Sequence, residues 1–295
     1  MRRVAPFLLS LSLVAGCSSQ PPLPDPSKPW TDVLDAKRHH TITGTVRLIP
    51  ALSVLGRERR VWLYLPPGYA ESKERYPVLY MHDGQNLFDQ ATAYAGEWGV
   101  DETLEELIAA KKVPPMIVVG IDNGGQARMD EYVPFKTKYG QGGEADAYVA
   151  WLIKELKPQI DGAFRTKSGP ESTWIGGSSL GGYISLWAGL HHPEVFGGIL
   201  AFSTPFDLGD GAAVIREAIA QRPAKPQRYY LDIGQLEEEP APGIVALNQD
   251  VTDRIGQSGV AAADRTLVVD PAGVHNEGAW RRRFPKAIEW LTAHP

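Results

Sequence analysis

A short glycine-rich segment in the middle of the chain limits what the whole chain can fold into. Residues 172–175 are typical of a strand, residues 183–188 are typical of a helix, and Gly176-Gly177-Ser178-Ser179-Leu180-Gly181-Gly182 joins them. Where a strand turns this sharply into a helix, side chains two positions from the turn would collide, so glycine is required there. The segment therefore predicts a strand–turn–helix unit of an α/β protein.

The register of this turn selects one of two neighbouring serines. With Ser179 at the centre, glycines occupy both flanking positions of a G-x-S-x-G pattern, whereas with Ser178 at the centre Leu180 takes a glycine position. Ser179 would then lie at a helix N-terminus, where free amides favour nearby negative charge. We expect Ser179 to be a nucleophile. The alternative is a glycine-rich turn that binds phosphate or only packs tightly.

The rest of the chain predicts one α/β domain over residues 30–295, with a mainly parallel sheet and helices on both of its faces. The first two strands are close in sequence and predict an antiparallel hairpin at one sheet edge. The expected strands are Thr41–Leu48, Arg59–Leu65, Val78–His82, Met116–Ile121, Ser172–Ile175, Gly198–Ala201, Arg228–Ile233 and Arg265–Val269. The expected helices are Asp101–Lys111, Ala145–Ile160, Leu180–Leu190, Gly211–Ala220, Val245–Gln257 and Trp280–Ala293.

A hydroxyl nucleophile needs a base, and histidine suits that role near neutral pH. The best candidate is His275, in a loop after the last predicted strand and before the last helix. His82, at the end of an early strand, is also a candidate site residue. The other histidines are expected in solvent or at a helix end: His39, His40, His191, His192 and His294.

An acid is needed to orient the histidine, and proteins with this serine turn place it between serine and histidine in the chain. The strand that contains Asp232 is followed by Glu237, Glu238 and Glu239. We take Glu237 as the acid, although the other two glutamates remain alternatives. Asp207, after the preceding strand, is a reserve candidate.

Acyl transfer also needs backbone amides directed at the carbonyl oxygen. The amide of Leu180, which follows the nucleophile, is one candidate. The other is the amide of Gln85, because Gly84 permits a tight turn after an early strand, with His82 and Asp83 holding that loop. An ordinary polar turn or a metal site is the alternative. Since the chain has no H-E-x-x-H pattern and no Cys/His cluster, we expect no metal.

The N-terminus predicts export and a lipid anchor. Arg2 and Arg3 precede an apolar run that is too short to span a bilayer, and Cys17, the single cysteine, follows it in a segment that resembles a bacterial lipobox. We expect residues 1–16 to be a signal peptide and residues 17–29 to be a lipidated, proline-rich tether on the periplasmic side of the outer membrane if the host is Gram-negative. The alternative is an ordinary secretory signal. The net charge of −5 argues against nucleic acid as a partner.

Several segments together resemble one known family. They are residues 82–89, 97–101, 117–123, Arg128 with Glu131-Tyr132, residues 175–182, residues 231–234, and His275-Asn276-Glu277 with Trp280. In this order and spacing they are similar to the putative-esterase (esterase D-like) family of α/β-hydrolases. That family includes siderophore, feruloyl and acetyl-xylan esterases and mycolyltransferases.

The resemblance implies an α/β-hydrolase fold and a serine esterase that cleaves carboxylic esters without a cofactor. It implies a Ser179–Glu237–His275 triad and an oxyanion hole formed by the Gln85 and Leu180 amides. It further implies substrate contacts near four residues: Asn86, Trp98, Arg128 and Glu131. The run of three glutamates departs from the lone acid of several members.

Other functions remain open at this point. A siderophore (ferric-catecholate) esterase is one specific form of the same activity. An acyltransferase that uses a sugar or lipid hydroxyl as acceptor would have the same triad, because the two reactions differ in how the site excludes water. A binding lipoprotein on an inactive hydrolase scaffold is the non-enzymatic alternative. The sequence does not indicate an oligomeric state.

Overall fold

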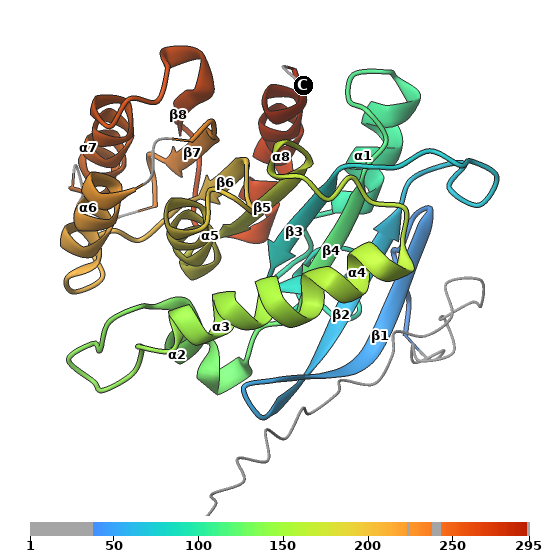
Figure 1. Cartoon of the computed structure of the whole chain (residues 1–295), viewed down its shortest axis with the longest axis horizontal. Coiled ribbons are helices and arrows are strands. Elements are labelled where there is room, and N and C mark those ends of the chain that lie inside the picture. Colours follow the sequence, from blue (N-terminus) through green and yellow to red (C-terminus); the bar gives the residue numbers. More distant parts are fainter. Residues whose placement is uncertain (1–37, 223–224, 238–242, 294–295) are drawn as a thin grey trace, which may run out of the picture.

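Eight strands form one sheet through the centre of the molecule (Figure 1). The computed structural model describes residues 38–222, 225–237 and 243–293. The strand order is β1-β2-β4-β3-β5-β6-β7-β8, in which β2 pairs antiparallel with β1 and β4 and the remaining neighbours are parallel. The strands are β1 (Thr45–Val54), β2 (Arg57–Leu65), β3 (Val78–His82), β4 (Ile117–Ile121), β5 (Thr173–Ser178), β6 (Gly198–Phe202), β7 (Arg228–Gly234) and β8 (Arg265–Asp270).

The predicted edge hairpin is confirmed, but β1 begins and ends later than the predicted Thr41–Leu48. The backbone amides of Thr41 and Thr43 donate to side-chain carboxylates of Asp89 and Asp101 instead of to a neighbouring strand. A register shift between Ile49 and Leu52 then lets the strand continue. Tertiary contacts therefore move this strand.

The helices are α1 (Val100–Ala109), α2 (Arg128–Tyr132), α3 (Ala145–Trp151), α4 (Lys157–Ala163), α5 (Leu180–His191), α6 (Gly211–Gln221), α7 (Gly243–Gln257) and α8 (Glu277–Thr292). The predicted helix 145–160 contains α3 and most of α4, joined by the π-helical turn η4 (Leu152–Leu156). The short helix α2 was not predicted. Helix α8 begins earlier than predicted because the Asn276 side chain accepts a hydrogen bond from the Ala279 amide, at 2.9 Å, and caps it.

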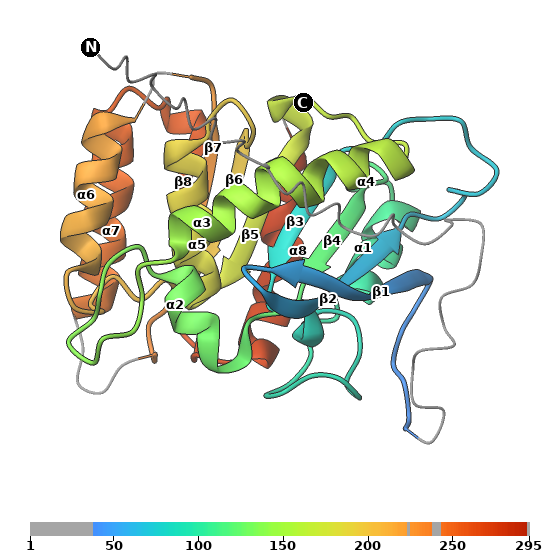
Figure 2. The same ribbon diagram turned by 60° about the horizontal axis from the view of Figure 1, so that its bottom comes forward.

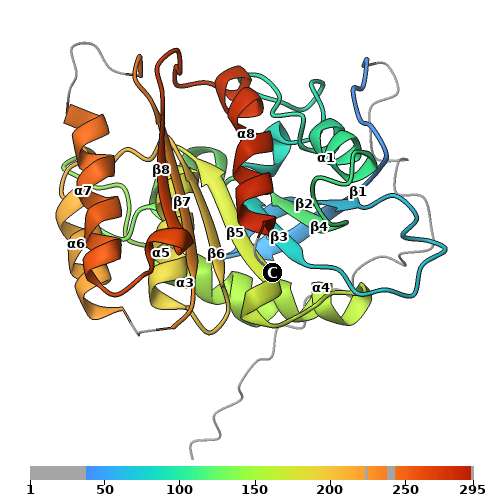
Figure 3. The ribbon, with the colours of Figure 1, turned by 90° about the horizontal axis from the view of Figure 1, so that it is seen from above.

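Helices cover both faces of the sheet (Figures 2 and 3). Alternate side chains of each strand point to opposite faces, so that Leu63 packs in a core with α3 to α7, whereas Trp62 and Tyr64 pack in a second core with α1 and α8. In the ranges that the structure describes, no helix is both long enough and apolar enough to cross a membrane. The predicted α/β-hydrolase fold is confirmed.

The parallel part of the sheet brings six loops to one edge. Strands β3 to β8 are neighbours in register, and all of their carboxyl ends lie at that edge. Ligands of open α/β sheets bind there. The predicted catalytic, oxyanion and substrate-contact residues all come from segments that follow these strands, whereas Cys17 lies outside the described residues.

Candidate active site

Ser179 occupies the sharp turn between β5 and α5 that its flanking glycines predicted. Its φ of 56° and ψ of −128° form a backbone conformation that non-glycine residues rarely adopt, and its amide donates to the carbonyl of Phe202 at 2.8 Å. A Cβ on Gly177 would lie 2.9 Å from the carbonyl carbon of Gly181, and one on Gly181 would lie 3.1 Å from Asp83 Oδ2. Gly177 is therefore required sterically, and a side chain at Gly181 would have to displace Asp83.

His275 lies between β8 and α8 and reaches the same cavity as Ser179. Its Nδ1 lies 3.0 Å from Glu237 Oε2, and its ring packs edge-on against Trp280. Within the described ranges Ser179 Oγ is not hydrogen-bonded to the imidazole, which is common before a substrate binds. The structure thus brings the predicted base and the predicted acid together beside the predicted nucleophile.

The carboxylate of Glu237 is held by several donors besides His275. Its Oε1 accepts from Ser203 Oγ at 2.6 Å and from the Gly234 amide at 2.7 Å. Burial would raise the pKa of Glu237, but the hydrogen bonds from His275, Ser203 and Gly234 outweigh burial and lower that pKa. Glu237 is therefore ionised near neutral pH and can orient a histidine. Glu238 and Glu239 lie outside the described residues, and Asp207 is exposed.

Arg283 and Asp232 lie behind the acid, and the sequence did not assign either of them a role. The Arg283 Nη2 atom lies 3.3 Å from Glu237 Oε1 and 2.8 Å from Ser203 Oγ, while its Nε lies 3.3 Å from Asp232 Oδ2. Burial is the main cause that raises the pKa of Asp232, to about 8. The positive charge of Arg283 opposes this increase, and the negative charge of Glu237 adds to it. The one available signal is that Arg283 falls on the buried face of α8, beside Phe284.

The two predicted oxyanion amides belong to the first turns after β3 and β5. Leu180 is the first residue of α5, and Gln85 lies in the short helix η2 (Gly84–Asn86). In the described part of the chain neither amide donates to a backbone carbonyl. Gln85 lines the cavity, and its carbonyl accepts from Thr92 Oγ1 at 2.9 Å. Both amides are available to an acceptor, as an oxyanion hole requires.

An ion pair supports the loop that carries Gln85. Asp83 has a left-handed φ of 58°, and its carboxylate receives two hydrogen bonds of 2.8 Å from Arg128 and one of 2.6 Å from Asn123. Although burial would raise the pKa of Asp83, Arg128 and Asn123 lower it overall. Arg128 also lines the cavity, so it reaches the predicted substrate region while it holds this loop.

His82 is a buried structural residue in this geometry. Its side chain packs against the rings of both Tyr132 and Tyr148, and its Nδ1 lies 3.0 Å from the Tyr148 hydroxyl. Burial lowers the pKa of His82 to about 4, although Asp83 opposes the change. His82 is therefore neutral at pH 7 and fixes the end of β3, as predicted for its loop.

The four predicted substrate contacts separate into two pairs. Asn86 and Arg128 line the cavity, whereas Trp98 and Glu131 do not. Trp98 is buried in the core against Phe202, and Glu131 is fully buried in an ion pair with Arg59. The prediction of direct substrate contact is corrected for these two residues. An aromatic or charged residue in a motif can serve core packing or a buried ion pair instead of contacting the substrate.

The cavity at this edge has a volume of about 1010 Å³, and Ser179 and His275 line it together. Glu277 also lines it and was not predicted as a site residue. It directly follows the helix cap Asn276, and its Oε1 accepts from Asn86 Nδ2 at 3.2 Å. Burial raises the pKa of Glu277. Its position two residues after His275 was the available signal.

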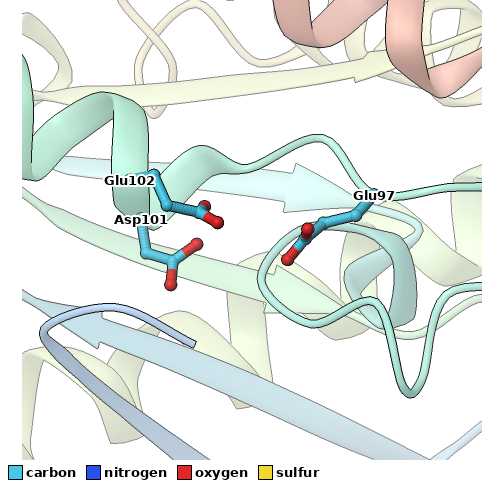
Figure 4. A group of neighbouring side chains, drawn as sticks. All are labelled: Glu97, Asp101 and Glu102. Atoms are coloured by element: carbon cyan, nitrogen blue, oxygen red, sulfur yellow. The ribbon is translucent and has the colours of Figure 1, made fainter. Parts of the chain in front are cut away.

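A separate acidic cluster ties the segment before β1 to α1. Figure 4 shows the carboxylates of Glu97, Asp101 and Glu102 near one another. Arg281 pairs with Glu97 at 3.2 Å, and the Thr43 amide donates to Asp101 at 2.6 Å. Burial, together with the hydrogen bond that protonated Asp101 donates to Glu102, raises the pKa of Asp101 to about 8. The positive charge of Arg281 and a proton on Asp101 offset the negative charge of the three carboxylates. We therefore assign no ligand to this cluster.

Fold and site together define an α/β-hydrolase with a serine nucleophile. The model of the "Putative esterase" family matches residues 53–291, and the chain belongs to this family of carboxylic ester hydrolases.

Two curated relatives carry specific names. The iron(III) enterobactin esterase of Dickeya dadantii is 27% identical over 255 residues, which are 80% of this chain and 52% of that protein. The endo-1,4-beta-xylanase/feruloyl esterase of Xylanibacter ruminicola is 33% identical over 249 residues, which are 80% of this chain and 30% of that protein. The chain thus spans only part of the length of both relatives.

Among solved structures, an IroE-like serine hydrolase from Shewanella oneidensis is similar to this chain with a TM-score of 0.67 and 22% identity. The likeness covers 86% of this chain and 80% of that chain. At this level of identity the comparison supports the fold alone.

Proposed function

We propose that this chain hydrolyses carboxylic esters with Ser179 as nucleophile, His275 as base and Glu237 as the orienting acid. The observation that carries the proposal is the 3.0 Å contact of His275 with an ionised, buried Glu237, beside a serine held in a strained turn at the same cavity. A triad requires this combination of groups.

The residues can perform each step of the reaction. Ser179 Oγ attacks the carbonyl carbon while His275 takes the hydroxyl proton, and the carbonyl oxygen becomes an oxyanion that accepts from the Gln85 and Leu180 amides. As the carbon–oxygen bond to the alcohol breaks, His275 gives that proton to the leaving oxygen. Water then attacks the acyl-enzyme with the same base and releases the acid.

Openness of the site favours water over another alcohol as the acceptor. The His275 side chain is 39% exposed, so that water can reach the base after the first alcohol leaves. We therefore infer hydrolysis as the main reaction rather than acyl transfer. Hydrolysis and transfer to added glycerol or glucose, measured side by side, test this inference, and transfer that exceeds hydrolysis at millimolar acceptor would contradict it.

The triad is tested with a fluorophosphonate probe and p-nitrophenyl acetate. We expect the protein to be labelled, and Ser179→Ala to abolish labelling and to lower kcat by at least about 10⁴-fold. Ser178→Ala is the matched control, since it removes the neighbouring hydroxyl and keeps the turn; it should retain labelling. Labelling that survives Ser179→Ala would refute the assignment.

For substrates we infer esters of the kinds named for the two relatives, an iron(III) enterobactin ester or a feruloyl ester. Asn86 and Arg128 are the proposed contacts, because both line the cavity with Ser179. A panel of ferric and iron-free enterobactin, methyl ferulate and acetylated xylan, compared by kcat/KM, decides among them. Equal and low values throughout would exclude both classes.

We also propose that Cys17 carries a lipid anchor and that the chain is exported. Residues 1–37 lie outside those that the structure describes. The support therefore comes from the sequence alone, in which an apolar run leads to this single cysteine. Metabolic labelling with an alkyne fatty acid should mark the wild type and not Cys17→Ala, and fractionation should place the labelled protein with outer membranes. Unlabelled protein in the soluble fraction would contradict both parts.

A further inference from the structure

Three carboxylates line the cavity, and they differ in what neutralises them. Asp83 pairs with Arg128 at 2.8 Å, and Asp122 pairs with Arg60 at 2.6 Å. Glu277 makes no ion pair with any residue of the described ranges, and the hydrogen bonds to its carboxylate there come from the Asn86 side chain, at 3.2 Å, and from the Glu277 backbone amide. Glu277 is thus the carboxylate of this cavity that has no ion-pair partner in direct contact within the described ranges, although Arg128 acts on its charge from farther away.

The surroundings of Glu277 leave it able to accept more hydrogen bonds. A carboxylate has about four acceptor positions, and the Asn86 side chain and the Glu277 backbone amide use only part of them. Glu277 is buried, with 7% of its surface exposed, yet it lies on the wall of the cavity and not in the core. When a substrate fills the cavity, water is displaced from this carboxylate. Without a donor on the substrate, a buried acceptor would then be left unsatisfied, which is costly.

The position of Glu277 indicates which part of the substrate it meets. It follows His275 by two residues, and His275 must reach the oxygen of the departing alcohol. On its other side Glu277 contacts Asn86, the residue after the oxyanion amide of Gln85. A group between the base and the oxyanion loop is placed to meet the alcohol portion of the ester.

The charges of the cavity indicate an uncharged donor. Its lining holds Arg38, Arg60 and Arg128 against the three carboxylates, so the formal charges sum to zero while His275 is neutral. A substrate with a neutral hydroxyl keeps this balance, whereas a cationic group would add a positive charge beside the arginines.

We propose that Glu277 forms a subsite that accepts a hydrogen bond from a hydroxyl group on the alcohol portion of the ester, close to the scissile bond. The proposal rests on the esterase function proposed above, and it makes Glu277 a specificity-determining residue. A site that contains an acceptor discriminates mainly against the analogue that lacks the donor. An ester of a polyhydroxylated alcohol would therefore be preferred over one of a simple alkanol.

The test compares three esters of butyric acid that differ at one atom or group: 2-hydroxyethyl, propyl and 2-(dimethylamino)ethyl butyrate. We expect the wild type to hydrolyse the hydroxyethyl ester with a kcat/KM about tenfold or more above that of the propyl ester. Glu277→Gln should reduce this ratio to within about twofold, because the amide oxygen keeps the hydrogen bond from Asn86 while the NH2 group toward the substrate accepts none. The variant should therefore lose the higher kcat/KM that the wild type has for the hydroxyl-bearing ester.

Glu289→Gln is the matched control, because it makes the same change on the same helix outside the cavity; it should keep the wild-type ratio. A Glu277→Gln variant that slows both esters equally would make Glu277 a positioning residue for Asn86 and overturn the subsite. Equal kcat/KM values for the hydroxyethyl and propyl esters in the wild type would also overturn the subsite. A preference for the amino ester would contradict the inference that the donor is an uncharged hydroxyl. If the wild type hydrolyses no ester and escapes the fluorophosphonate probe, the esterase function itself fails.

Discussion

Two cavities of similar size lie at opposite ends of the same six parallel strands. The one at the carboxyl ends has a volume of about 1010 Å³, and the one at the amino ends has about 880 Å³. Segments that follow β3, β4, β5 and β8 line most of the first, and residues just before or at the start of β3 to β8 line most of the second. Size alone therefore does not distinguish them.

Chemistry does distinguish them. Of the non-glycine residues with positive φ in the described ranges, Asp83, Ser179 and Ser203 directly follow β3, β5 and β6 at the carboxyl ends. The amino-end cavity has none of these strained residues, and prolines make up much of its wall: Pro77, Pro114, Pro115, Pro170, Pro193 and Pro226. Proline suits the start of a strand and donates no hydrogen bond. Backbone strain and converging polar groups, not volume, indicate where reaction takes place.

The largest expected difference between the two ends comes from replacing a carboxylate by its amide. Glu237→Gln should lower kcat by about 10³- to 10⁴-fold, because the amide no longer stabilises the imidazolium of His275 and can favour the wrong tautomer. Glu194→Gln, the same change at the wall of the amino-end cavity, should leave kcat within about twofold. Steady-state kinetics with p-nitrophenyl acetate measures both. Comparable losses in the two variants would remove the distinction.

Local patterns were enough to predict the parts of this site that depend on local geometry. Gly177 and Gly181 leave little or no room for a side chain beside the turn, so their spacing identifies Ser179 directly from the sequence. His275 was predictable because a loop after the last strand must reach the same sheet edge as Ser179. The mainly parallel sheet, its edge hairpin and the helices on both faces likewise followed from apolar runs of the right lengths, whereas the order of the strands did not.

Residues whose role depends on tertiary contact could not be predicted in the same way. Ser203 and Arg283 are distant in sequence, and only the packing of α8 against β6 and β7 brings both to Glu237. Trp98 showed the opposite error, since a motif position gave no indication that the ring points into the core. Single-sequence patterns give the element of a residue but not the direction in which its side chain points.

Removing the cation behind the acid should have the second-largest effect. Arg283→Gln leaves Glu237 and Asp232 buried without their shared cation, so the pKa of Glu237 should rise and the acid limb of the kcat/KM–pH profile should move to higher pH. We expect about 3 kcal/mol or more of lost stability, and a fall of about 10²-fold in kcat at pH 6.

Arg283→Lys tests whether position or charge matters in this cluster. The lysine variant should restore the pH profile in part, because it keeps a positive charge but lacks the fork that reaches two acids. Arg75→Gln, at the amino-end cavity, provides the control and should leave the pH profile unchanged. An unaltered acid limb in Arg283→Gln would show that Arg283 contributes to packing alone.

A matched pair of substitutions by tryptophan, one at each cavity, should have a smaller effect, and this effect should be on substrate binding. Ala95 and Lys225 are both exposed, and each lines one of the two cavities. Ala95→Trp narrows the carboxyl-end cavity and should raise KM about tenfold for a bulky ester such as methyl ferulate, with little change for an acetate ester. Lys225→Trp should leave both KM values unchanged. An effect of Lys225→Trp alone would assign substrate binding to the amino-end cavity.

The smallest expected effect concerns the pH dependence of stability, and it compares an aspartate at each end. The pKa of Asp232 is about 8 in the folded protein and 3.8 without burial, so the folded state binds this proton more tightly. The stability that this group contributes is fully present below pH 4 and is lost as the pH rises through about 8. Relative to the wild type, Asp232→Asn should therefore gain Tm between pH 6 and 9, by on the order of a few degrees.

Asp264 supplies the control, since its side chain is 45% exposed and lies at the amino-end cavity beside Arg228. Asp264→Asn should shift Tm by the same small amount at every pH. Thermal melts of the three proteins from pH 5 to 9.5 make the comparison, and the difference between variant and wild type cancels other titrating groups such as Asp101. A constant difference for Asp232→Asn would mean that Arg283 holds Asp232 ionised throughout, with the charge behind the triad fixed. A growing difference would mean that a proton on Asp232 leaves Arg283 to Glu237 alone at neutral pH, which is the arrangement that best keeps the orienting acid ionised.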